Sequence, residues 1–487
     1  MSGVLKNLNP EPVFRYFEEI SRIPRGSGNE RAISDYLVEF ANKHNLEIIR
    51  DDVLNVTIKK PAAPGYEKAP TVIIQGHMDM VNEKNKETVH DFDKDPIKLR
   101  IVDDMIYATD TTLGADNGIA IAYALAILES KEIPHPALEV LLTTNEESTM
   151  GGALNFDASH MKGSFLINID SEEEGKLLVS SAGGTKARIV LPINWEVPKC
   201  AYAVYKLIIG GLKGGHSGID IDKGRGNASK LMGRLLSDIS KRMELYVAEV
   251  NGGLKSNAIT REAEAVICIN PAYNSRLEEL VKNWDKTFKN ELRATDSEVY
   301  AKAESYLGKV GKVFSADSMN KLISAMVILP SGVQSMSMEI PGLVESSTNL
   351  GVVQTLENEV YLVNEIRSSV RSKKYAICNK VKTIAEVLGG NLEIDSDYPE
   401  WEYNPDSRLR SLFMKVYKKK YGKDAEIIAI HAGLECGVLI QKMEGLDAIS
   451  IGPNLYDVHT PQEHLNIPST QRVWEYLLDV LKEMKNM

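Results

Sequence analysis

Cysteine is scarce in this chain, which has four cysteines among 487 residues. They are Cys200, Cys268, Cys378 and Cys436, and no two of them form a C-x-x-C pair. Disulfide frameworks and cysteine zinc sites both need several thiols at short, recurring spacings. Neither kind of site is therefore expected here.

Long hydrophobic runs are also missing. The longest apolar stretch, IAIAYALAIL at 119–128, is about half the length of a membrane-spanning helix. The first twenty residues lack the continuous apolar segment of a secretory signal. We therefore expect a cytoplasmic protein that has no membrane partner.

An excess of positive charge is absent as well. The chain has 57 Lys and Arg against 68 Asp and Glu, which gives a net charge of −11. Nucleic-acid-binding proteins usually carry a basic stripe, so no nucleic-acid partner is expected. H-E-x-x-H, G-x-S-x-G and Walker A motifs do not occur either. With 43% hydrophobic and 26% charged residues, the composition is that of an ordinary folded protein.

Strand-like and helix-like segments alternate in the first part of the chain. The strand-like runs are 70–75, 137–144 and 163–169, and a helix-like run covers 114–132. This alternation predicts an α/β fold with a mixed, mostly parallel sheet flanked by helices. Exposed, alternating strands follow, and the α/β pattern returns near Pro399. We therefore expect one α/β domain in two parts, 1–182 and 399–487, interrupted by an inserted α+β domain at 183–398.

The inserted segment contains a weak internal echo. Residues 253–269 and 342–366 both begin with Gly-Leu, continue with Ser and Asn, and then show alternating strand residues. Duplication of a two-layer unit and chance likeness of two hairpins both remain open.

Acidic residues and histidines follow the predicted strands. His77 and Asp79, Glu146 and Glu147, Asp170, and His459 each come shortly after an apolar run. Asp116 lies at the start of the predicted helix. Ligands of open α/β sheets bind beyond the carboxyl ends of the strands, so these residues are expected at one edge.

This set of side chains is typical of a metal site. Imidazole and carboxylate groups suit Zn²⁺, Mn²⁺ or Co²⁺. Five such groups exceed one tetrahedral site and favour two ions about 3.5–4 Å apart. A carboxylate is the natural bridge between two cations, and Asp116 is the candidate. Asp116 as a helix cap and His459 as an ordinary loop residue remain the alternatives.

Two further roles follow from spacing. Asp79 lies two residues after His77, on the same side of an extended segment, and can orient the imidazole ring. Glu146 and Glu147 are adjacent, so one can bind metal while the other acts as a general base. A solvated surface pair is the alternative for these two residues.

Five motifs give the sequence a specific resemblance. GHMDMV, LGADNGIA, TTNEESTMGG, INIDSEEEG and DVHTPQEH occur in this order. In this order they resemble the dinuclear zinc peptidase family of carboxypeptidase G, peptidase T and carnosinase. GGHSGIDID, SNAI and HAGLECG are most similar to the bacterial aminoacyl-histidine dipeptidases of that family. The resemblance covers essentially the whole chain.

The resemblance implies a role for each motif residue. It implies two divalent ions, Zn²⁺ before Co²⁺ or Mn²⁺, with Asp116 as the bridge and Glu146 as the general base. Asp79 would orient His77. The implied metal ligands are His77, Asp116, Glu147, Asp170 and His459. His464 lies five residues after His459, but the family pattern favours His459.

The inserted domain is implied to be a lid. His216 would stabilise the oxyanion, and Asn257 and Arg367 would bind substrate, with Arg367 on the C-terminal carboxylate. A turn histidine and a surface arginine are the alternatives. Glu435 is expected to bind the α-amino group of the substrate, and His431 to line the same pocket.

The implied activity is hydrolysis of dipeptides, of the Xaa-His type that includes β-alanyl-histidine, by a water bridging the two ions. A tripeptidase or an N-acyl amino acid deacylase on the same site remains an alternative. A non-catalytic metal-binding scaffold is disfavoured because Glu146 and all five ligands are present. The expected partner is a small peptide, and both a monomer and a homodimer remain open.

Overall fold

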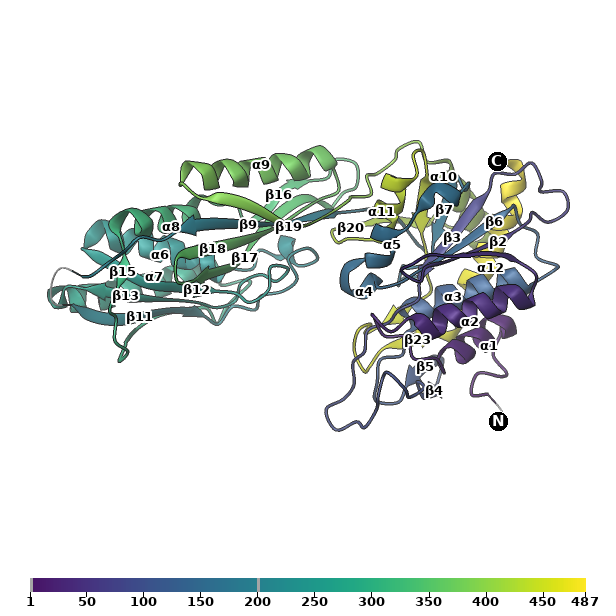
Figure 1. The fold of residues 1–487 in the computed structure, drawn as a ribbon, viewed down its shortest axis with the longest axis horizontal. Helices are drawn as coiled ribbons and strands as arrows, with labels where there is room; N and C mark the ends of the chain where they lie inside the picture. Colours follow the sequence, from purple (N-terminus) through teal and green to yellow (C-terminus); the bar gives the residue numbers. More distant parts are fainter. Residues whose placement is uncertain (1–2, 199–201) are drawn as a thin grey trace. The chain divides into compact units, whose positions relative to one another are not determined.

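The computed structural model describes residues 3–198 and 202–487, so Cys200 lies outside the described residues. The chain divides into two compact units. The first unit is Met1–Ser180, Tyr403–Ala429 and Glu435–Met487, and the second unit is Ser181–Glu402 with Ile430–Leu434. Both chain termini lie in the first unit (Figure 1).

An eight-stranded mixed sheet forms the centre of the first unit. Its strands, in spatial order, are β1 (Glu47–Arg50), β2 (Val56–Lys60), β6 (Leu138–Thr143), β3 (Val72–His77), β7 (Phe165–Asn168), β21 (Asp447–Ser450), β8 (Lys176–Ser181) and β20 (Glu426–Ile430). The central strands β6, β3, β7 and β21 are parallel, whereas β1–β2, β2–β6 and β21–β8 pair antiparallel. The predicted mixed α/β fold is confirmed.

Helices flank this sheet in the first unit (Figure 1). They are α1 (Glu11–Ile20), α2 (Arg31–Lys43), α3 (Ala115–Glu129), α10 (Arg408–Tyr421), α11 (Glu435–Lys442) and α12 (Ile467–Glu483). Helix α3 is apolar on every side, and its residues from Asn117 to Leu128 are buried. It packs against both α1 and β3, because a helix that is apolar all round must be covered on every face. The start of α3 is therefore held at the end of β3.

Short elements surround the ends of the central strands. Helices α4 (Glu146–Thr149) and α5 (Gly151–Asn155) follow β6. A small antiparallel sheet contains β22 (Leu455–Tyr456), β23 (His464–Asn466), β5 (Met105–Ala108) and β4 (Leu99–Val102). Single 3₁₀ turns of this unit lie at Ala158–His160 and Met484–Asn486, and those at Ile221–Lys223 and Pro271–Tyr273 belong to the second unit. The small sheet pairs two hairpins far apart in sequence and so fixes the loop 457–463 at one end of the unit.

A nine-stranded sheet forms the second unit. Its main path contains β14 (Tyr300–Ser305), β11 (Ala203–Gly210), β13 (Ala263–Ile269), β12 (Leu245–Gly252), β17 (Val344–Thr355), β18 (Glu359–Ser368), β9 (Gly183–Pro192) and β19 (Asn391–Tyr398), with β16 (Gly332–Met336) paired to β17. A separate pair joins β10 (Trp195–Glu196) to β15 (Val313–Phe314). Helices α6 (Ala228–Arg242), α7 (Asn274–Glu291), α8 (Ala316–Ile328) and α9 (Arg371–Val387) share one hydrophobic core with the sheet.

The second unit repeats one topology. Its first half runs β11-α6-β12-β13-α7-β14, and its second half runs β9-α8-β17-β18-α9-β19. In both halves the fourth strand lies beside the first, then the third, then the second. The halves join where β12 pairs antiparallel with β17. The echo segments 253–269 and 342–366 fall on the middle hairpins of the two halves.

The described part of the chain contains neither a membrane-spanning helix nor a disulfide bond. No helix there is long and apolar enough to cross a bilayer. Cys268, Cys378 and Cys436 are free thiols, and two of them, Cys268 and Cys436, are buried.

Candidate metal centre

Five segments of the first unit bring acids and histidines together. His77 ends β3, and Asp170 lies two residues after β7. Asp116 lies in the first turn of α3, where the backbone of Asp116 and Asn117 is not helical. Glu146 and Glu147 begin α4, which follows β6, and His459 lies in the loop between β22 and β23. Strands β3, β6 and β7 are parallel, so their carboxyl ends meet at one edge.

Asp116 lies between two histidines. Its Oδ1 atom is 3.1 Å from Nε2 of His77, and its Oδ2 atom is 3.2 Å from Nε2 of His459. The two oxygens of one carboxylate thus face two different imidazole rings. This is the geometry of a carboxylate that can bind one cation through each oxygen.

Each histidine also has a second carboxylate beside it. Oδ1 of Asp170 is 3.5 Å from Nε2 of His77, and Oε2 of Glu147 is 3.0 Å from Nε2 of His459. Two potential ligand groups result, which share Asp116: His77, Asp116 and Asp170; and Asp116, Glu147 and His459. A third group combines His77 with Glu146 and Glu147.

These separations fit metal ions. Ligand atoms that lie 2.0–2.1 Å from a tetrahedral Zn²⁺ are about 3.3 Å from one another. The N···O distances of 3.0–3.5 Å in the two groups that share Asp116 are close to that value. In addition, Oε1 of Glu147 is buried and has no hydrogen-bond partner. The donor set and its spacing therefore fit two divalent cations.

Burial and crowding perturb the pKa values of these groups. Burial raises the pKa of Glu146 well above its ordinary value, and burial raises that of Asp170 to about 6. Burial acts to raise the pKa of Asp116, but hydrogen bonds from His459 and His77 together lower it below its ordinary value. Hydrogen bonds to Asp116 and Glu147 raise the pKa of His459 to about 11. Several buried carboxylates close together are unfavourable unless positive charge compensates them, and divalent cations can supply that charge.

Asp79 holds two parts of the cluster at once. It is 0% exposed, and its Oδ1 atom lies 3.4 Å from Nδ1 of His77. Its carboxylate also accepts hydrogen bonds from the backbone N–H groups of Glu146 (3.0 Å) and Glu147 (3.2 Å) and from the hydroxyl of Ser27 (2.7 Å). The position fits the expected orientation of His77, and it also links Asp79 to the turn that carries Glu146.

His464, the alternative to His459, has other neighbours. Its ring lies between those of Tyr107 and Tyr456, at centroid distances of 4.6 and 5.0 Å, and Nδ1 is 2.8 Å from the carbonyl oxygen of Gln462. It belongs to β23, whereas His459 lies in the preceding loop with a backbone φ of +62°. That left-handed conformation is uncommon for a residue with a side chain, and such conformations cluster at functional sites.

Three residues that support the cluster were not predicted from the sequence. Asn117 donates to Oδ1 of Asp170 (2.6 Å), and its Oδ1 accepts the backbone N–H of His77 (3.3 Å). Arg25 and Glu463 are both 2% exposed and bind the backbone near the ligands. Asn117 and Glu463 lie inside two of the recognised motifs, which is a signal that was available, whereas Arg25 lies in no motif.

His216 lies in the second unit with a defined tautomer. Its Nδ1 atom accepts hydrogen bonds from the backbone N–H groups of Gly218 (3.2 Å) and Ile219 (3.1 Å). Nδ1 is therefore unprotonated, and Nε2 carries the hydrogen of the neutral ring. Burial, followed by the charge of Arg367, lowers the pKa of His216. The ring can thus donate a hydrogen bond from Nε2 while it stays neutral.

Arg367 and His431 lie near His216 in the same unit. Nη1 of Arg367 donates to the hydroxyl of Tyr398 (2.7 Å), while Nε is buried without a partner. His431 is buried with Nε2 2.7 Å from Oγ of Ser347, and burial, with the charges of Arg367 and His216, lowers its pKa to about 3. Arg367 is thus an interior residue and not a surface one.

Asn257 and Glu435 lie at different places. Asn257 is exposed in the second unit, and its carbonyl accepts the N–H of Ser217 beside His216 (2.9 Å). Glu435 is buried at the start of α11 in the first unit. It accepts hydrogen bonds of 2.6 Å from Gln75 and from Thr143. Its Oε1 atom has no partner, and burial raises its pKa to about 7.

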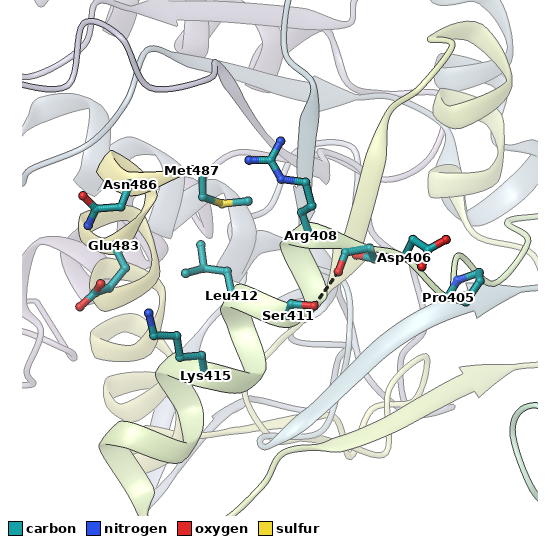
Figure 2. Close-up of a pocket in the computed structure, with 10 residues that line it drawn as sticks. Pro405, Asp406, Arg408, Ser411, Leu412, Lys415, Glu483, Asn486 and Met487 are labelled. Atoms are coloured by element: carbon teal, nitrogen blue, oxygen red, sulfur yellow. Dashed lines mark hydrogen bonds between the residues drawn. The ribbon is translucent and has the colours of Figure 1, made fainter.

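A surface pocket elsewhere in the first unit contains none of the predicted site residues. It lies between the start of α10 and the end of the chain, where Arg408, Ser411, Leu412, Lys415, Glu483 and Met487 line it (Figure 2). Acidic and basic side chains both line it, and they do not converge as a set of catalytic groups.

Comparisons with known proteins agree with the motifs. The model of peptidase family M20/M25/M40 matches residues 73–483. The cytosol non-specific dipeptidase of Escherichia coli (strain K12) is 37% identical over 480 residues, which cover 99% of each chain. The crystal structure of an aminoacylhistidine dipeptidase from Vibrio alginolyticus matches with a TM-score of 0.91 at 38% identity, covering 98% of each chain.

A more distant structure shares only the fold. The aminopeptidase PepT of Bacillus cereus matches with a TM-score of 0.56 at 16% identity, covering 98% of this chain and 99% of that chain. The family resemblance read from the motifs is confirmed by the match to the family model and by the curated relative of the same length. The chain belongs to peptidase family M20/M25/M40.

Proposed function

We propose that this protein is a metal-dependent dipeptidase whose catalytic centre is the cluster around Asp116. The observation that carries the proposal is the Asp116 carboxylate, whose two oxygens face His77 and His459 at 3.1 and 3.2 Å. Two relatives that match nearly the full chain are a non-specific dipeptidase and an aminoacylhistidine dipeptidase, which supports the substrate class.

We propose two ion positions that share Asp116. His77 and Asp170 complete one position, and Glu147 and His459 complete the other. Zn²⁺ suits this mixture of imidazole and carboxylate ligands, as Co²⁺ and Mn²⁺ also do. When bound, the two ions supply Lewis acidity, which polarises the scissile carbonyl and lowers the pKa of the attacking water.

The residues of the chain supply the proton transfers. Oε2 of Glu146 lies 4.0 Å from Nε2 of His77, and burial raises its pKa well above that of an ordinary glutamate. Bound cations favour the ionised form of this carboxylate, so Glu146 takes the proton of the water and returns it to the leaving amine. Asp79 fixes both the ring of His77 and the backbone of Glu146.

Groups of the second unit bind the substrate in this proposal. The Nε2–H of His216 donates to the developing oxyanion, because Nδ1 is already occupied as an acceptor. The unpartnered Nε of Arg367 suits the C-terminal carboxylate of a dipeptide. Asn257 lies beside His216, and His431 lies near the guanidinium group of Arg367. In the first unit, the free Oε1 of Glu435 suits the α-amino group.

We further propose a preference for Xaa-His dipeptides and a location in the cytosol. The preference follows the name of the Vibrio alginolyticus relative, an aminoacylhistidine dipeptidase, and the location follows that of the Escherichia coli relative, a cytosol non-specific dipeptidase. A panel of Xaa-His dipeptides, other dipeptides, tripeptides and N-acyl amino acids tests the preference. A kcat/KM for tripeptides or acyl amino acids above that for every dipeptide contradicts the dipeptidase proposal.

The test of the centre is the Glu146→Gln variant. It keeps the size of the side chain but removes the base, so we expect about two ions per chain, as in the wild type, and a kcat lowered by about 10²–10⁴-fold. The control is Glu173→Gln, which changes an exposed glutamate of the INIDSEEEG segment that is paired with Lys176. Full activity in a fully metallated Glu146→Gln variant rules out its role as the base.

A further inference from the structure

Glu463 is a buried carboxylate outside the ligand set. It is 2% exposed and accepts hydrogen bonds from four consecutive backbone N–H groups. Its Oε2 atom binds the N–H groups of Leu113 (2.7 Å) and Gly114 (2.9 Å), and its Oε1 atom binds those of Ala115 (2.8 Å) and Asp116 (3.3 Å). The whole turn that leads into Asp116 is therefore wrapped around one side chain.

The opposite side of this turn is also held. Arg25, equally buried, donates from Nη2 to the carbonyl of Gly114 and from Nη1 to the carbonyl of Met78 (2.9 Å). Gly114 has a φ of +69°, and a β-carbon there would lie 2.7 Å from the guanidinium of Arg25. A buried ionised carboxylate is costly unless it is paired and hydrogen-bonded, and here N–H groups and a nearby arginine fulfil that condition.

Glu463 connects two ligands that are far apart in the sequence. It lies four residues after His459, while the turn that it binds ends at Asp116. His459 is 49% exposed at its side chain and lies in a loop, so it has little packing of its own to fix it. The carboxylate of Glu463 thus ties the loop of His459 to the turn of Asp116.

The two ion positions differ in their support. Asp116 belongs to both positions, so they differ in their remaining ligands. His77 ends the buried strand β3, Asp170 follows the neighbouring strand β7, and Asn117 links the two residues directly. In the other position, Glu147 lies in α4 directly after β6, whereas His459 lies in a loop that Glu463 ties to the turn of Asp116. Loss of Glu463 must therefore disturb the second position more than the first.

We propose that Glu463 is a positioning residue that assembles the ion position formed by Asp116, Glu147 and His459. This inference rests on the proposed function, because it takes the cluster to be a two-metal centre. Groups that orient metal ligands commonly change metal affinity by about 10–100-fold when they are removed. The expected effect is a selective loss of affinity for one of two ions.

The test is a titration of the metal-free Glu463→Gln variant with Zn²⁺ and with Co²⁺. Glutamine offers one oxygen, so one pair of N–H groups loses its acceptor and faces an amide donor. We expect the ion at the position of Glu147 and His459 to bind about 10–100-fold more weakly, and the other ion, which shares only Asp116 with it, to lose less affinity. Calorimetry and metal analysis give stoichiometry and affinity, and the Co²⁺ absorption spectrum reports the altered geometry without any activity assay. Excess metal should restore most of kcat.

The matched control is Glu139→Gln. Glu139 is 3% exposed and its carboxylate accepts the backbone N–H groups of Lys162 and Gly163 (2.9 Å each to Oε2), in a loop without predicted ligands. This variant removes the same charge from an equally buried acceptor, so both ion affinities should stay at the wild-type level. An equal loss of affinity in Glu139→Gln overturns the inference.

The outcomes separate this inference from the proposed function. Wild-type chain that binds fewer than two ions at the cluster contradicts the two-metal proposal itself. If the wild-type chain binds two ions and Glu463→Gln binds both with wild-type affinity, only the role of Glu463 is overturned. Circular dichroism of the metal-free variants checks folding. Where Glu463→Gln does not fold, Glu463→Asp decides, because it keeps the charge but is one methylene too short for all four N–H groups; unchanged affinities there overturn the inference.

Discussion

Replacing Asp79 by asparagine should weaken the proposed metal centre without changing its shape. The side chain keeps its size, but one oxygen becomes an NH₂ group. In the structure, Oδ1 accepts the N–H of Glu146, while Oδ2 accepts the N–H of Glu147 and the hydroxyl of Ser27. Whichever way the amide is turned, a donor faces at least one backbone N–H.

The size of the effect follows from that unpaired group. A buried donor that loses its acceptor destabilises a protein by about 1–3 kcal/mol. We expect the free energy of unfolding of the metal-free Asp79→Asn variant to fall by about that amount. If the turn that carries Glu146 moves to relieve the clash, the same energy appears in the barrier, and kcat falls by about 5–150-fold. Part of the loss should be a weaker metal affinity, because the variant removes the negative charge that lies 3.4 Å from Nδ1 of His77, although the main-chain carbonyl of Asp79 still lies 3.1 Å from that nitrogen.

Urea denaturation of the metal-free protein, metal titration and steady-state kinetics measure the three effects. Ser27→Ala is the matched control, since it removes one hydrogen bond to the same carboxylate and leaves its charge and its contacts with the turn. That control should cost about 1 kcal/mol of stability and little kcat. An Asp79→Asn protein with wild-type stability, metal affinity and kcat refutes the reasoning.

Three other perturbations have defined outcomes. Gly114→Ala should lower the unfolding free energy by more than about 1–2 kcal/mol, because its β-carbon would lie 2.7 Å from both Arg25 and Met80. The control Gly28→Ala also changes a glycine at positive φ, but in open space, so it should show only the smaller backbone effect. Thermal unfolding compares the two variants. His431→Gln should make the protein less sensitive to acid. The folded pKa of His431 is about 3 against an ordinary 6.5, so the unfolded chain binds more protons, and the wild type loses stability as pH falls from about 6.5 to 3. Urea denaturation at pH 7 and pH 4 should show a smaller difference in the variant, and an equal difference contradicts the burial argument. Removal of the ions with a chelator should lower the unfolding temperature reversibly, because ligand at about 100 times its Kd adds about 2.7 kcal/mol; calorimetry before and after Zn²⁺ is restored measures this, and an unchanged temperature contradicts metal binding by the folded state.

Residues at the ends of strands could be located from the sequence, because the hydrophobic pattern predicts the strand and the residues after it lie at its end. An apolar run such as 70–75 predicts a buried strand, and whatever follows it in a parallel sheet reaches the binding edge. His77, Glu146, Glu147 and Asp170 were found in this way. The helix 115–129 was equally accessible, because a uniformly apolar run of that length forms a buried helix.

The targets of backbone-mediated contacts could not be read from the sequence, although Glu463 itself lies in the DVHTPQEH motif. Arg25 and Glu463 act on carbonyl and N–H groups of Gly114, and every residue except proline offers such groups. No residue pattern therefore marks which loop they bind. The small sheet that holds the His459 loop is equally hidden, because its strands are two to four residues long and come from distant hairpins.

The five-residue segment Ile430–Leu434 has a practical consequence for dissecting the molecule. It leaves the first unit after Ala429 and returns at Glu435, so the polypeptide passes between the units four times and not twice. Splicing Ser180 to Tyr403 would remove the nine-stranded sheet but keep His431. Its buried hydrogen-bond partner Ser347 would then be missing. A truncated enzyme intended to carry only the metal cluster must therefore also bridge Ala429 to Glu435 with a polar linker.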